Sequence, residues 1–81
     1  MKIILITGAG SGIGYETAVS LKAQGHKIYG GVRDQRSVEK LTQSGIIPLE
    51  LDITDERQCK QAVERIIKHD KRIDVLINNA G

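Results

Sequence analysis

Four glycines lie within seven positions near the start of the chain, in the stretch ITGAGSGIGYE: Gly8, Gly10, Gly12 and Gly14. Glycine loses more conformational entropy on folding than any other residue, so this clustering indicates that a partner must approach the backbone closely. The glycines follow an apolar, strand-like run and precede a helix-like segment. A turn in that position aims backbone N–H groups and the positive end of a helix dipole at an anion. The stretch therefore predicts a phosphate-binding turn.

The spacing of these glycines excludes two common phosphate-binding motifs. Counted from Gly8, both GxxxxGK[ST] and GxGxxG require a glycine where the chain has Ile13. The pattern that is present is Thr7-Gly8-x-x-x-Gly12-x-Gly14.

The composition is that of an ordinary globular chain and argues against several classes of partner. The 81 residues include 12 basic and 10 acidic side chains, a net charge of +2 with both signs interspersed. This balance does not indicate a nucleic acid or a membrane surface as partner. Cys59 is the single cysteine, no Cys/His cluster predicts a metal site, and no segment reads as a signal peptide or a membrane span. We therefore expect a cytoplasmic protein without metal, membrane or nucleic-acid partners.

Apolar runs alternate with helix-like segments along the chain. Strands are expected at residues 2–6, 27–32, 46–51 and 73–77, and helices at 15–24 and 37–43. An apolar stripe at 59–67 predicts a third helix, with Thr54 or Asp55 as its N-cap. Strands that alternate with helices pair in parallel through right-handed crossovers. We therefore predict an α/β fold, the N-terminal half of a doubly wound, Rossmann-like parallel sheet. Its strand order would be 3-2-1-4, with a ligand crevice between the first and fourth strands.

Three segments together resemble the classical short-chain dehydrogenase/reductase family. They are TGxxxGxG at 7–14 after the first strand, Leu51-Asp52-Ile53 after the third, and NNAG at 78–81 after the fourth. The resemblance covers the whole chain. It implies pyrophosphate contacts from the glycine turn, with the Ile13 N–H among the donors, a hydrogen bond from Asp52 to the adenine ring, and packing of Ile53 on that ring. The implied cofactor-binding residues are Thr7, Gly8, Gly10, Ser11, Gly12, Ile13, Gly14, Arg33, Asp52, Ile53, Asn79, Ala80 and Gly81.

The residue after the second strand distinguishes NADP from NAD. An acid there accepts hydrogen bonds from the ribose 2′-hydroxyl, whereas an arginine neutralises a 2′-phosphate. Arg33 follows Val32, the last residue of the expected strand, and resembles the basic residue of the family's NADP-preferring members; Arg36 adds charge nearby. If the register moves by two residues, Asp34 becomes an NAD-type acid. The prediction is NADP(H), with NAD as the alternative.

The catalytic spacing of the resembled family does not occur in this chain. The family uses a Ser and a Tyr-x-x-x-Lys pair for proton transfer, but Tyr15 is followed at that spacing by Val19, and Tyr29 by Arg33. We therefore expect residues 1–81 to be the N-terminal portion of a dinucleotide-binding domain, apparently truncated after the fourth strand, without catalytic residues. The resemblance implies a homo-oligomeric parent enzyme, an NADP(H)-dependent oxidoreductase that interconverts a hydroxyl and a carbonyl on a small-molecule substrate. The alternatives are a non-catalytic dinucleotide-binding module and an inactive fragment.

Overall fold

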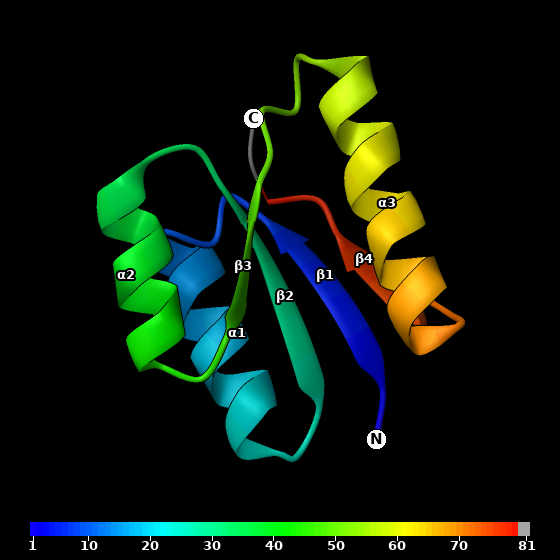
Figure 1. The fold of residues 1–81 in the computed structure, drawn as a ribbon. Helices are drawn as coiled ribbons and strands as arrows, with labels where there is room; N and C mark the ends of the chain where they lie inside the picture. The colour runs from blue at the N-terminus through cyan, green and yellow to red at the C-terminus, as the bar shows by residue number, and fades with distance from the viewer. Residues whose placement is uncertain (80–81) are drawn as a thin grey trace.

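A single parallel sheet organises the chain. The computed structural model describes residues 1–79, and its four strands lie in the order β3-β2-β1-β4 (Figure 1). Each of the three strand pairings is parallel, which confirms the predicted Rossmann-like α/β fold and its strand order. The elements are β1 (Ile3–Thr7), α1 (Gly12–Ala23), β2 (Lys27–Val32), α2 (Gln35–Gln43), β3 (Ile47–Glu50), α3 (Glu56–Asp70) and β4 (Val75–Ile77).

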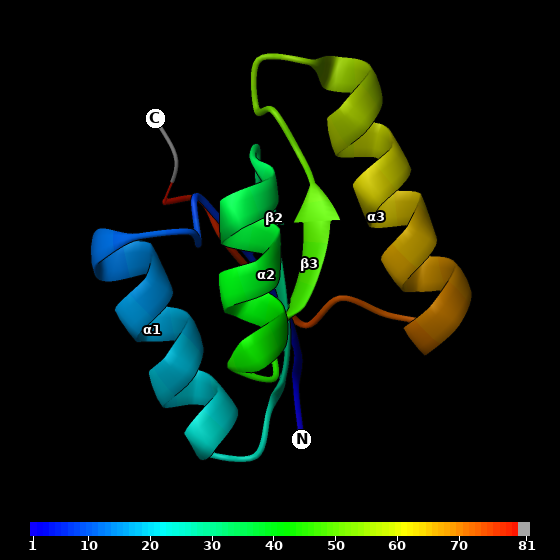
Figure 2. The same ribbon diagram turned by 60° about the vertical axis from the view of Figure 1, so that its left-hand side comes forward.

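Helices cover both faces of this sheet. α1 and α2 lie on one face and α3 lies on the other, as Figures 1 and 2 show together. β1 contributes to both cores, because Ile4 and Ile6 pack under α1 and α2 while Ile3 and Leu5 pack under α3. Because β1 is buried on both faces, its residues are apolar on both sides and show no alternation with polar residues. Within residues 1–79, no helix has the length and apolar character needed to cross a membrane.

The helix that follows the glycines begins earlier than the sequence predicts. The expected start was Tyr15, whereas α1 begins at Gly12. Ser11 is extended, and Gly12 has a φ of 58°, in the left-handed region that glycine adopts freely. The glycine motif therefore runs into the helix itself, and Gly14 lies in the first turn of α1. α2 also begins early, at Gln35 rather than at residue 37.

The long helix α3 has a defined cap at each end. Asp55 Oδ1 accepts hydrogen bonds from the N–H groups of Arg57 and Gln58 at 3.0 and 3.3 Å. Asp55, rather than Thr54, is therefore the N-cap. At the other end the backbone of Lys71 is left-handed, with a φ of 71°.

A half-buried ion pair joins the end of α3 to β2. The side chain of Asp70 is 10% exposed, and its carboxylate lies 2.6 Å from Lys27 Nζ. The hydroxyl of Tyr29 donates to the other carboxylate oxygen. The hydrogen bonds from Lys27 and then from Tyr29 lower the pKa of Asp70 from 3.8 to about 2.

We expect this ion pair to make stability depend on pH. Because the folded-state pKa of Asp70 is depressed, its contribution is fully present above the unfolded-state pKa and is lost as the pH falls toward about 2. The free energy of unfolding, measured by urea titration, should therefore drop more steeply with acid in the wild type than in Asp70→Asn. Asp34→Asn is the matched control, because the exposed Asp34 side chain makes no capping bond. Parallel pH profiles for the wild type and Asp70→Asn would contradict this role.

Candidate functional site

The glycine turn presents the amino end of α1 to solvent. Gly8 and Gly12 have φ angles of 63° and 58°, which turn the chain from β1 into the helix. The first N–H groups of any α-helix lack intrahelical acceptors, and the Ser11 side chain makes no capping bond to them. The Ile13 side chain is 75% exposed, so its part of the turn is open. Backbone donors and the positive helix end therefore face the same open side.

Close approach of three segments explains why position 14 is a glycine. A Cβ built on Gly14 would collide with the carbonyl oxygen of Gly8 and with the side-chain amide of Asn79. The Gly8 oxygen belongs to the backbone, so a larger residue could not be accommodated by rotating a side chain. Gly14 therefore keeps α1 in contact with the turn and with the segment after β4.

The segment after β4 is fastened to the glycine turn by side-chain hydrogen bonds. Asn79 Nδ2 donates to the carbonyl oxygen of Gly8 at 3.0 Å, and the Asn79 N–H donates to Thr7 Oγ1 at 3.0 Å. Thr7 Oγ1 donates in turn to Asn78 Oδ1 at 3.1 Å. The structure thus brings Thr7, the turn and Asn79 together, and their contact with a cofactor stays a prediction. Ala80 and Gly81, which were also predicted to contact the cofactor, lie outside the described residues.

A second helix also holds the turn, through residues that no motif in the sequence indicates. Lys40 Nζ, on α2, donates to the carbonyl oxygen of Gly10 at 3.1 Å and lies 4.0 Å from the centre of the Tyr15 ring. A Cβ on Gly10 would lie 2.5 Å from the hydroxyl oxygen of Ser37 and would collide with it. The spacing of Ser37 and Lys40 places both on one side of a helix. That spacing was readable in the sequence, but nothing there indicated that this side faces Gly10.

The ends of β2 and β3 bring Arg33 and Asp52 together. A guanidinium nitrogen of Arg33 lies 3.7 Å from Asp52 Oδ2, and the Arg33 side chain is 75% exposed. Hydrogen bonds from the side chain and backbone of Thr54 lower the pKa of Asp52, and the charge of Arg33 lowers it further.

Two hollows lie near these residues. Asp34 lines the same hollow of about 130 Å³ as Arg33. Ile53 lines a separate hollow of about 190 Å³ with Thr7 and other residues near the carboxyl ends of the strands.

Comparison with known proteins shows the family. The family model described as short chain dehydrogenase matches residues 2–81. The chain belongs to the short-chain dehydrogenase family. Within residues 1–79, no group of three or more His, Cys, Asp and Glu side chains could hold a metal ion.

Individual relatives of this short-chain dehydrogenase chain are similar over almost all of its length. It is 47% identical to a 3-ketodihydrosphingosine reductase of Bacteroides thetaiotaomicron, over 99% of the chain and 28% of that protein. It is 40% identical to a probable NADP-dependent dehydrogenase of Dichelobacter nodosus, over 98% of the chain and 77% of that protein. Among solved structures, a short-chain dehydrogenase from Streptomyces avermitilis superposes on this chain with a TM-score of 0.91 and 31% sequence identity. The superposition covers 99% of this chain and 30% of the Streptomyces avermitilis chain. The chain thus spans less than a third of the reductase it matches.

Proposed function

We propose that this chain is the NADP(H)-binding part of an oxidoreductase that interconverts a hydroxyl and a carbonyl group on a small-molecule substrate. Residues 1–81 would form the N-terminal portion of its dinucleotide-binding domain. The observation that carries the proposal is the glycine turn, which opens the amino end of α1 beside Asn79. Family membership supports an NAD(P)-dependent reaction.

The residues around the turn fit a dinucleotide. The N–H groups of residues 12–14, at the positive end of α1, suit a pyrophosphate, and the space beside Gly12 is open. Asp52 would accept a hydrogen bond from the adenine amino group, and Ile53, which is 36% exposed, would pack on the ring. Thr7 and Asn79 would hold the turn in shape between β1 and β4. The bound cofactor would donate a hydride in its reduced form and accept one in its oxidised form.

Arg33 supports NADP(H) over NAD(H). It is the first residue after β2, its guanidinium is largely exposed, and its contact with Asp52 is long at 3.7 Å, so the guanidinium can also reach a 2′-phosphate. The name of the Dichelobacter nodosus relative, a probable NADP-dependent dehydrogenase, agrees with this choice. No residue of the chain is assigned a catalytic role.

Cofactor fluorescence tests the proposal directly. Titrating the chain into NADPH and into NADH should give a dissociation constant at least about tenfold lower for NADPH, since one charge-assisted hydrogen bond contributes about 1.5–3 kcal/mol. Tighter binding of NADH would indicate an NAD site, in which Asp34 accepts hydrogen bonds from the ribose 2′-hydroxyl. Failure to bind either dinucleotide would overturn the proposed function.

Asp52 gives a prediction for the adenine end of the site. We expect Asp52→Ala to weaken NADH binding by about two- to tenfold, as loss of one hydrogen bond contributes about 0.5–1.5 kcal/mol. NADH is the ligand to use, because it has no 2′-phosphate. With NADPH, an Arg33 that has lost its contact with Asp52 could bind the 2′-phosphate more tightly and mask the loss of the adenine hydrogen bond. Asp52→Asn is the matched control, since its amide oxygen can accept the same hydrogen bond. If Asp52→Ala lowers only the urea midpoint and leaves NADH affinity intact, Asp52 serves the turn before α3 and not the cofactor.

A further inference from the structure

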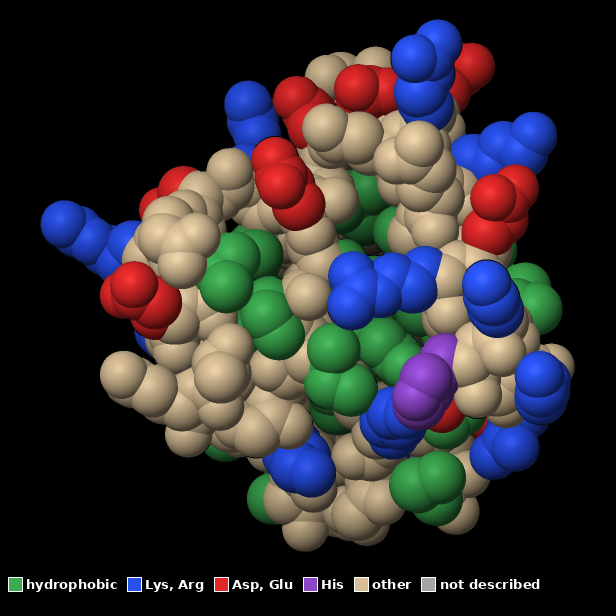
Figure 3. Space-filling model, viewed as in Figure 1, with side chains coloured by type: hydrophobic (Ala, Val, Ile, Leu, Met, Phe, Trp, Pro, Cys, Tyr) green, Lys and Arg blue, Asp and Glu red, His purple; other side chains and the backbone are tan. Residues whose placement is uncertain are grey.

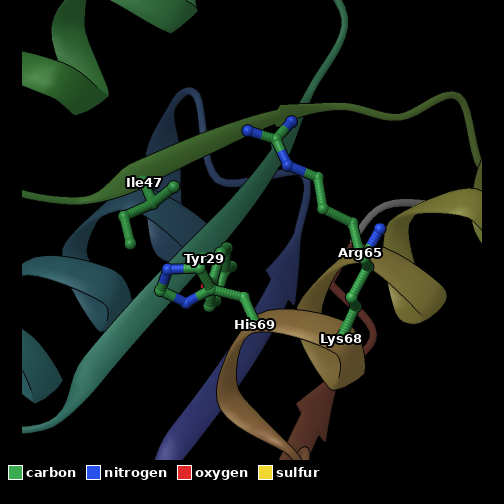
Figure 4. Close-up of a pocket in the computed structure, with 5 residues that line it drawn as sticks. All are labelled: Tyr29, Ile47, Arg65, Lys68 and His69. Carbon is green, nitrogen blue, oxygen red and sulfur yellow. The ribbon is translucent and has the colours of Figure 1, made fainter.

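A further hollow lies on the face of the sheet that α3 covers, opposite the face covered by α1 and α2. It has a volume of about 430 Å³ and is lined by Tyr29, Ile47, Arg65, Lys68 and His69 (Figure 4). We call it the Tyr29 hollow. It lies between the second half of α3 and the strands β2 and β3, where Ile47 is the first residue of β3. The glycine turn leaves the other end of the sheet, so the two sites do not overlap.

The floor of the Tyr29 hollow is apolar. Tyr29 and Ile47 are paired in register on neighbouring strands, and Tyr29 is 4% exposed. The polar end of Tyr29 is already satisfied, because its hydroxyl donates to Asp70. The almost fully buried ring lies at the bottom of the hollow, and the half-buried Ile47 beside it adds apolar surface of the kind that lines most small-molecule sites.

The rim of the same hollow is basic. Arg65, Lys68 and His69 follow one another at helical spacing on α3, and Figure 4 shows Arg65 extending from α3 toward β3. Within residues 1–79, the side chains of Arg65 and Lys68 form no hydrogen bond or ion pair. Asp70, the carboxylate next to His69 in the chain, is paired with Lys27 at 2.6 Å. Glu50 lines a neighbouring hollow together with Arg65, without an ion pair between them. On the molecular surface, Figure 3 shows hydrophobic side chains that lie between Lys or Arg side chains and a histidine.

We propose that the Tyr29 hollow binds a small organic anion that joins an apolar ring or short chain to one carboxylate, sulfonate or phosphate group. The apolar part lies on Tyr29 and Ile47, and the anionic group pairs with Arg65 and Lys68. The volume lies within the range of about 300–1,000 Å³ usual for small-molecule sites. Arginine suits such an anion because its planar guanidinium can donate two parallel hydrogen bonds.

Two matched dyes test the proposal. Anilinonaphthalene sulfonate has the apolar rings and one negative charge, and phenylnaphthylamine has the same rings without the charge. The double variant Arg65→Gln/Lys68→Gln should weaken sulfonate-dye binding by about three- to tenfold, the range for two partly exposed ion pairs. Its affinity for the neutral dye should change by less than about twofold. An equal loss for both dyes, or no loss for either, would overturn the proposal.

A control on the same helix separates the site from general charge. Arg57→Gln/Lys60→Gln removes the same two charges from the first half of α3, away from the hollow, and should leave both affinities unchanged. Saturating NADP⁺ should not displace the sulfonate dye, since the proposed cofactor site lies at the other end of the strands. Displacement would place the dye at the glycine turn and overturn the assignment. The comparison of variants does not depend on whether the chain binds NADP⁺, so the two proposals fail separately.

Discussion

Replacing Gly14 with valine is expected to weaken NADPH binding by at least about tenfold and to lower the free energy of unfolding by about 1–3 kcal/mol, as overpacking does. The added side chain would meet the carbonyl oxygen of Gly8 and the amide of Asn79. Relief requires α1 to move away from Gly8 as well as from Asn79. That movement displaces the N–H groups that we assign to the pyrophosphate. NADPH fluorescence and urea titration measure the two effects.

Ser20→Val is the matched control for this substitution. Ser20 is an exposed residue of the same helix, so valine there has the same β-branched side chain and the same low helix propensity without the collision. It should change NADPH affinity by less than about twofold. Unchanged affinity in Gly14→Val would remove the glycine turn from the proposed site.

Arg33→Ala is expected to lower the preference for NADPH over NADH by about ten- to hundredfold, because a lost charged contact to phosphate amounts to about 1.5–3 kcal/mol. The loss should fall on NADPH, while NADH affinity stays nearly constant, because only NADPH carries the 2′-phosphate. Titrations with both cofactors at low and high salt give the ratio of the two dissociation constants for the wild type and for Arg33→Ala. The difference in this ratio between the two proteins should be smaller at high salt, because the contact of Arg33 is exposed to solvent and is screened.

Arg36→Ala provides the comparison for Arg33. Arg36 is an exposed arginine within α2, so its removal changes the net charge equally and should have a smaller effect on the ratio. If the ratio stays constant in Arg33→Ala, Arg33 is a surface residue. Asp34 then becomes the better candidate for contact with the ribose.

Local pattern was enough to predict the sheet. The unbroken apolar run of β1 indicated burial on both faces, and the alternation of strands and helices indicated parallel pairing in the observed order. The cap of α3 was predictable to within one residue, because Asp55 has the side chain that accepts first-turn N–H groups. These features depend on residues close in sequence or on a general rule of topology.

The contacts within the site depend on packing and could not be predicted in the same way. Asn79 and Gly8 are 71 positions apart, and Lys40 and Gly10 are 30 apart. Which side of α2 faces the turn is set by how the helix is oriented when it packs on the sheet. The early start of α1 has a similar origin, since tertiary contacts of Gly14 outweigh the low helix propensity of glycine. The Tyr29 hollow likewise depends on where α3 lies over β2 and β3.

A heteronuclear NMR titration of the isotopically labelled chain with NADP⁺ locates the bound cofactor. We expect the largest amide shifts at Gly12, Ile13 and Gly14, with further shifts at Arg33 and Asn79, and none at Tyr29 or Ile47. Shifts centred on the Tyr29 hollow, or no shifts at saturating NADP⁺, would contradict the proposed cofactor site.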